Sequence, residues 1–253
     1  MLTPQASNTK RVLKITIFLE LIAILSAIIR AIVLDRNPQR YFGEGGYITW
    51  ISFIQLVIIA IIAFLIFRLR LQAHQASGMG NQARRYLLWI IMAGGFVFLA
   101  CDEILQFHEK LDFWIHDVLK LQETGLTDRI DALIVLIYLC CGVIFLYYQR
   151  RELRTFKPAL PLFVVGFALA LVMVVLDSLT DRGDIIALVL QDSDQVKIWK
   201  TWLDTLEESL KIFAEGIFIV ACYRCWEIAK QQLESKKYRQ MLNLAAEEES
   251  AKE

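Results

Sequence analysis

Two stretches of the sequence place carboxylates, an imidazole and an ammonium group beside long apolar runs. The first reads Cys101-Asp102-Glu103-Ile104-Leu105-Gln106-Phe107-His108-Glu109. In the second, Asp204, Glu208, Lys211 and Glu215 follow one another at intervals of four, three and four, the spacing of one helix face. A carboxylate is costly inside a bilayer, so acids within apolar segments usually face a bundle interior or an aqueous cavity and mark a functional site.

The faces that these side chains share depend on helix geometry. Residues seven positions apart differ by only roughly 20° around an α-helix, so Asp102, Glu109 and His116 share one face if the helix continues. His108 points away from that face and reaches it only if the helix unwinds or meets another helix. Asp177 ends a further apolar run. If these helix ends converge, they form an acidic pocket that opens on the outer side of the membrane.

The chemistry of such a pocket is set by its charge. Neighbouring carboxylates repel one another unless protons, a cation or basic side chains intervene, and Lys211 and Arg182 look too few to compensate them. We therefore expect shared protons or a bound divalent metal. Carboxylates with an imidazole suit Zn²⁺, Mn²⁺ or Fe²⁺, whereas carboxylates alone suit Mg²⁺ or Ca²⁺. The expected metal ligands are Asp102, Glu109, Asp177, Glu208 and Glu215.

Whether the protein is an enzyme stays open at this point. If it is, we expect metal-dependent hydrolysis or transfer on a lipid or small amphiphile, with His108 or Glu103 activating water and Lys211 stabilising negative charge. A transporter of cations or protons would use the same acids as a relay. A sensor or assembly subunit would instead dock a membrane-protein partner or a second copy of the chain. In the simplest alternative, the acids are solvated at the headgroup level.

The composition identifies the class of protein that must position these groups. The chain has 253 residues, of which 57% are hydrophobic and 21% charged, and its mean hydropathy is +0.47. These values exclude a disordered, fibrous or ordinary soluble protein. Lys and Arg number 27, as do Asp and Glu, so nothing indicates a nucleic-acid partner.

Six apolar runs are long enough to cross a hydrocarbon core about 30 Å thick, and in lipid each must be helical. The sequence therefore predicts an all-α integral membrane bundle of six transmembrane helices. The predicted spans are Val12–Leu34, Tyr47–Phe67, Tyr86–Phe107, Ala132–Tyr148, Ala159–Asp177 and Leu206–Trp226. They define a transmembrane domain over residues 1–226, followed by a charged, helix-prone tail over residues 227–253.

The basic residues predict the orientation of the bundle in the membrane. They gather in the N-terminal tail, in the connections 68–85 and 150–157, and after Arg224, whereas the other connections are mixed or acidic. Because Lys and Arg are enriched in cytoplasmic loops, both termini are predicted to be cytoplasmic.

Several residues inside the apolar runs carry expectations about packing. We expect Glu20 to pair with a basic residue of another helix and Gln55 to form an interhelical hydrogen bond. Small residues let helices approach closely, so Gly94, Gly95 and Gly166 are predicted at close helix contacts.

The segment Asp102-Glu103-x4-His108-Glu109, followed by Glu207-Glu208 and Glu215, resembles a group of uncharacterised bacterial polytopic membrane proteins. Those proteins carry a similar D-E-x4-H-E segment and a late E-E segment. The resemblance covers two short motifs and the number of helices. It implies a multi-pass protein of the bacterial inner membrane and no particular activity. A comparison with ceramidase-like hydrolases, which bind zinc through three histidines and an aspartate, fails because the last span here has no histidine.

Overall fold

The structure, a computed structural model, describes residues 4–34, 37–43, 45–75, 86–120, 130–180, 184–190 and 192–250. Over these ranges it contains helices and no β-strand. The long helices are α1 (Pro4–Val33), α3 (Tyr47–Gln75), α4 (Leu87–Leu105), α6 (Ile130–Tyr148), α8 (Leu160–Thr180) and α10 (Ser193–Ser250). The short ones are α2 (Gln39–Phe42), α5 (Phe107–Leu119), α7 (Arg150–Leu153), the 3-10 helix η2 (Arg154–Ala159) and α9 (Asp184–Val189).

Five helical segments of the described chain are long and apolar enough to cross a membrane. They contain α1, α3, α4, α6 and α8. Their outward faces expose large apolar side chains, among them Phe18 at 61% and Val164 at 68%. Such faces suit lipid, since the helix satisfies its own backbone hydrogen bonds. The predicted all-α class is confirmed for the described residues, and five of their helical segments have the length and composition of membrane spans.

Helix α10 is the central helix of the bundle. It packs against α3, α8 and α1, and the side chains of Ile212, Val220 and Ala221 are fully buried there. Its 58 residues extend over about 87 Å, far beyond the hydrocarbon thickness. The predicted sixth span, residues 206–226, lies within it and is not among the five membrane-length apolar segments. Its charged side chains are buried or partly buried. The helix continues past residue 226, and Leu233 is still buried.

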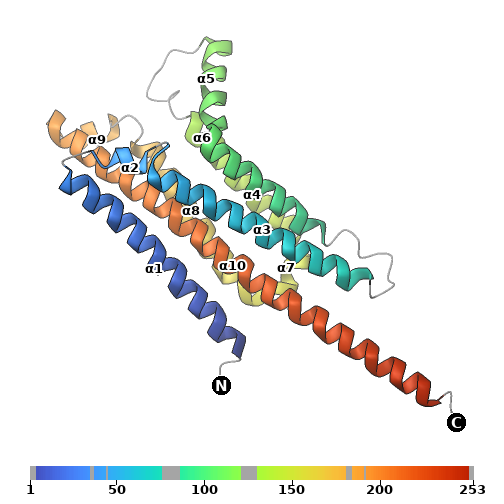
Figure 1. The fold of residues 1–253 in the computed structure, drawn as a ribbon. Coiled ribbons are helices and arrows are strands. Elements are labelled where there is room, and N and C mark those ends of the chain that lie inside the picture. Colours follow the sequence, from blue (N-terminus) through green and yellow to red (C-terminus); the bar gives the residue numbers. More distant parts are fainter. Residues whose placement is uncertain are drawn as a thin grey trace.

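The two ends of the bundle differ in what they carry. In Figure 1 the N- and C-terminal ends lie at one end, and α2, α5 and α9 lie at the other. The basic segment that contains α7 and η2 lies toward the end that holds the termini. Arg84 and Arg85, which belong to a predicted basic connection, and Arg182, the predicted counter-charge, lie outside the described residues.

The acid in the first span has an amide as its partner, rather than the expected basic residue. Gln55 Nε2 on α3 donates a hydrogen bond of 2.9 Å to Glu20 Oε1 on α1, and Glu20 is 3% exposed. The interhelical role predicted for Gln55 is thus confirmed.

The glycines divide into tight and open positions. A Cβ at Gly166 would lie 2.7 Å from the Phe218 ring, as the close-contact prediction requires. At Gly94 and Gly95 nothing lies within 4 Å, so the prediction is wrong there. One close contact was not predicted: a Cβ at Gly216 on α10 would overlap Glu20 Oε1 and lie 2.8 Å from Thr16 Cγ2.

This contact yields a stability prediction. Gly216→Ala is expected to lower the free energy of unfolding in mixed micelles by about 1–3 kcal/mol, because relief of the overlap displaces the Glu20 side chain from Gln55 and pushes Thr16 of α1 away. Gly94→Ala is the matched control, and there the better helix propensity of alanine raises stability by at most about 1 kcal/mol. Glu20→Ala should reduce the cost of Gly216→Ala. Equal costs for the two glycine substitutions would contradict this packing.

Candidate functional site

A break between α4 and α5 builds the first part of the site. Gln106 adopts the left-handed conformation with φ 54° and ψ 50°, which non-glycine residues rarely adopt. The chain therefore turns at Gln106, so the helix does not continue and the condition for a shared face of Asp102, Glu109 and His116 is not met. His116 Nδ1 lies 2.9 Å from Asp112 Oδ1 within α5 instead.

The same break brings His108 back to Asp102. The His108 backbone N–H donates to Asp102 Oδ1 at 3.0 Å, and His108 Nδ1 lies 2.9 Å from Asp102 Oδ2. Asp102 is only 6% exposed, and both of its carboxylate oxygens have partners. One accepts a hydrogen bond from a backbone N–H at the start of α5, and the other contacts the imidazole. An ionised carboxylate only accepts hydrogen bonds, so the tautomer with the proton on Nδ1 donates to Asp102 and leaves Nε2 as its basic nitrogen.

A second cluster joins α4 to α10 through one ammonium group. Lys211 Nζ lies 2.9 Å from Glu103 Oε1 and 2.8 Å from Glu208 Oε2. All three side chains are no more than 20% exposed. One ammonium between two ionised carboxylates leaves a net negative charge. Lys211 therefore compensates acids, and the role predicted for it, stabilising negative charge on a substrate, would compete with these contacts.

Glu215 lies on α10 facing α3. Ser52 Oγ donates a hydrogen bond of 2.7 Å to Glu215 Oε1. The other oxygen, Oε2, is buried without a hydrogen-bond partner, and the residue is 7% exposed. A buried carboxylate oxygen in this state is costly, so it marks a position where a further donor is favourable.

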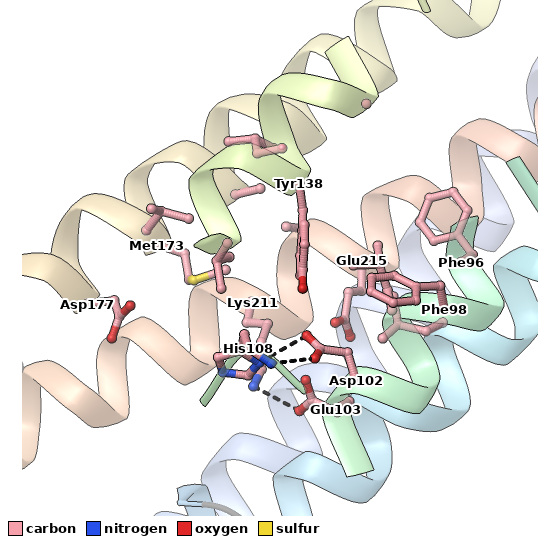
Figure 2. Close-up of a pocket in the computed structure, with 18 of the residues that line it drawn as sticks. Phe96, Phe98, Asp102, Glu103, His108, Tyr138, Met173, Asp177, Lys211 and Glu215 are labelled. Carbon is pink, nitrogen blue, oxygen red and sulfur yellow. Dashed lines mark hydrogen bonds and ion pairs between the residues drawn. The ribbon is translucent and has the colours of Figure 1, made fainter. Parts of the chain in front are cut away.

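A cavity of about 880 Å³ unites these groups. Helices α4, α6, α8 and α10 supply most of its wall. All eight predicted site residues line it: Asp102, Glu103, His108, Glu109, Asp177, Glu208, Lys211 and Glu215. Figure 2 shows Asp102, His108, Lys211 and Glu215 gathered with Tyr138, while Asp177 lies farther along α8. The predicted convergence of several helices on one hollow is thus present, and the residues' chemical roles stay predictions.

The cavity is polar at one end and apolar along the rest of its length. On α4 its lining extends from Ile91 to Asp102, a rise of about 17 Å. The apolar part is lined by side chains such as Met92, Phe96, Phe145, Leu146, Phe167 and Phe218. A volume between roughly 300 and 1,000 Å³ with mostly apolar walls and a few polar groups is typical of small-molecule sites.

The metal binding predicted for the acids of this cavity stays a prediction. Among the described residues, no group of three or more His, Cys, Asp and Glu side chains is arranged so that it could hold a metal. Protein partners already contact three of the five predicted ligands: His108 contacts Asp102, Lys211 contacts Glu208, and Ser52 donates to one oxygen of Glu215.

Several polar residues of the cavity were not predicted as site residues. Glu207 lies beside Glu208 on α10, and Asp131 lies at the start of α6; both line the cavity. Gln39 of α2 donates a hydrogen bond to Asp204, which joins the loop end of the bundle to α10. The doubled acid Glu207-Glu208 was a sequence signal for the first of these. Ser52 offered no signal, because a serine in an apolar span is common.

Comparison with known proteins places the chain in a family without assigning an activity. The chain matches no curated protein and no solved structure. A family model does match residues 12–226, which include the helix ends that surround the cavity. The chain belongs to that family, described as Domain of unknown function (DUF8692).

Proposed function

We propose that this membrane protein binds a lipid or small amphiphile inside its helical bundle. The observation that carries the proposal is the cavity of about 880 Å³, with its charged cluster at one end and its apolar wall along α4, α6, α8 and α10. An amphiphile has the same division, so its head would lie near Asp102, His108 and Lys211 and its chain between the aromatic side chains. This proposal needs no metal.

The test fills the apolar part of the cavity. Ala170 on α8 lines the cavity, whereas Val164 on the same helix is 68% exposed on the lipid side. In nanodiscs of phosphatidylcholine, Ala170→Phe should weaken binding of a fluorescent long-chain alcohol at least about tenfold, since the added ring occupies the volume of the chain. Val164→Phe should leave binding unchanged. Equal affinity for both variants would contradict binding within the bundle.

The second candidate function is catalysis on the bound amphiphile, favoured by the contact between His108 and Asp102. A carboxylate that orients an imidazole is the arrangement of a general base, and His108 lines the cavity. In this proposal His108 takes a proton from water as the water oxygen attacks an ester carbonyl of the amphiphile. The ester C–O bond then breaks, and His108 returns the proton to the alcohol that leaves, while Lys211 positions Glu103 and Glu208. Mass spectrometry of nanodisc lipids should reveal a product with the unsubstituted protein and none with Asp102→Asn. No product in either sample would refute catalysis without affecting binding.

Transport is less well supported by the described contacts. A relay needs ionisable groups across the membrane. Apart from the acids of the cavity, Glu20 on α1 is a buried acid, and it accepts a hydrogen bond from Gln55 on α3. The rest of the cavity wall, away from the acids, is lined by apolar side chains such as Phe145 and Phe218, which cannot relay protons.

We further propose that α10 is the sixth membrane crossing and that both termini face the cytoplasm of a bacterial cell. The basic residues of α7 and η2 and the shared end of the two termini support this orientation. In a variant whose five native cysteines are replaced, Lys237→Cys introduces one exposed thiol. This thiol should react with an impermeant maleimide only after spheroplasts are lysed. Labelling in intact spheroplasts would contradict the proposed orientation and place the C-terminal end outside the cytoplasm.

A further inference from the structure

We propose that the amphiphile carries a positively charged head, an organic ammonium group, held among the carboxylates at the polar end of the cavity. This inference rests on the proposed binding function and adds the charge and chemical class of the head. It concerns the polar end alone, which Figure 2 shows around Asp102, Lys211 and Glu215.

The first support is the charge of the wall. Nine acidic side chains of the described chain line the cavity, against one lysine and one histidine. The nine are Asp102, Glu103, Glu109, Asp131, Asp177, Asp204, Glu207, Glu208 and Glu215. Lys211 is already placed between Glu103 and Glu208, and His108 is held by Asp102. An anionic head would face repulsion here, whereas a cationic head would relieve the repulsion among the acids.

The second support is the buried oxygen of Glu215. Its Oε1 accepts a hydrogen bond from Ser52, but Oε2 has no hydrogen-bond partner although the residue is 7% exposed. Lys211 lies one helical turn away and still directs its ammonium group to Glu103 and Glu208. Glu215 therefore lines the cavity and keeps one buried acceptor that the nearest described cation does not fill. An N–H donor with a positive charge is the group that such an oxygen binds best.

The geometry distinguishes an organic cation from a metal ion. A metal needs several ligands at short distances around one point, and the described side chains do not form such a group. An ammonium head attached to an apolar body is larger and tolerates acids spread over the surfaces of α4 and α10. Aromatic side chains such as Phe98 and Tyr138 lie in the same wall, and an aromatic face also attracts a cation.

The experiment compares heads on one chain. In neutral nanodiscs, a dodecyl chain bearing an amine, a trimethylammonium, a hydroxyl or a carboxylate group competes with the fluorescent alcohol. We expect both ammonium compounds to compete at least about tenfold better than the alcohol, and the carboxylate to compete worst. Glu207→Gln with Glu215→Gln should abolish this preference while binding of the neutral alcohol changes by less than about threefold. Asp194→Asn, on the exposed start of α10, should retain the preference.

The outcomes separate the two proposals. If the alcohol or the carboxylate competes as well as the ammonium compounds, the cationic head is refuted and amphiphile binding stands. If the double variant binds the alcohol and keeps the full ammonium preference, the assignment to Glu207 and Glu215 is refuted. If no compound of any charge displaces the probe and the probe itself does not bind, the proposed function fails first.

Discussion

Lys211→Met is expected to lower the free energy of unfolding by about 3–5 kcal/mol, because it leaves Glu103 and Glu208 facing each other without their shared cation. Lys211 Nζ contacts the two acids at 2.9 and 2.8 Å, and its side chain is 18% exposed. Unfolding by a denaturing detergent in mixed micelles measures the change. The effect is large because the carboxylates stay in a cavity that solvates them poorly.

Two further variants show whether charge causes the loss. Removing the acids as well, in Lys211→Met with Glu103→Gln and Glu208→Gln, should restore most of the stability, since neutral amides do not repel. Lys197→Met removes a lysine from the exposed face of the same helix and should change stability by less than about 0.5 kcal/mol. If the triple variant is as unstable as Lys211→Met, lost packing of the lysine stem is the cause.

Arg70→Met should destabilise the opposite end of the bundle by a similar amount, about 3–5 kcal/mol. Arg70 on α3 contacts both oxygens of Glu152, with Nε 2.7 Å from Oε1 and Nη2 2.8 Å from Oε2. Its Nη1 also donates to Gln232 on α10 at 2.9 Å. The Glu152 side chain is 1% exposed, so loss of the guanidinium strands a buried charge.

The size of this effect is checked against three matched variants. Arg70→Lys keeps the charge but loses the fork that contacts both oxygens, so an intermediate loss is expected. Arg70→Met with Glu152→Leu should recover most of the stability, because no unpaired charge remains. Arg151→Met, at an exposed neighbour of Glu152, should have little effect. A full loss in the double variant would contradict a charge-based explanation.

The membrane-spanning architecture was readable from the sequence because lipid imposes a simple rule on composition. A run of about 20 apolar residues has few alternatives to a helix in a bilayer. The long helices accordingly overlap the predicted spans, with α3 beginning at Tyr47 and α6 ending at Tyr148 as expected, whereas α4 ends at Leu105 before the predicted Phe107. Helix α10 extends well beyond its predicted ends, since its continuation depends on helix propensity and on packing of residues such as Leu233.

The arrangement inside the site was harder to predict, because it depends on local exceptions and tertiary partners. The turn after Asp102 occurs at Gln106, with neither glycine nor proline to announce it. Without that turn, His108 could not be placed beside Asp102. The partners of Glu20 and Glu215 are the neutral side chains Gln55 and Ser52, which charge pairing does not anticipate. The predicted metal site needs carboxylates that are available to an ion. In the folded chain, other side chains contact several of these carboxylates, as His108 does for Asp102 and Lys211 for Glu208.

The most direct test of amphiphile binding within the bundle is photo-crosslinking with a neutral long-chain alcohol that carries a diazirine at the end of its chain. If the chain lies in the cavity, mass spectrometry should locate the adducts at inward residues of α6 and α8, such as Leu146 and Phe167. Excess unlabelled alcohol and Ala170→Phe should both suppress them. Adducts confined to lipid-facing residues such as Ile144 and Val164, unaffected by competitor, would contradict the account.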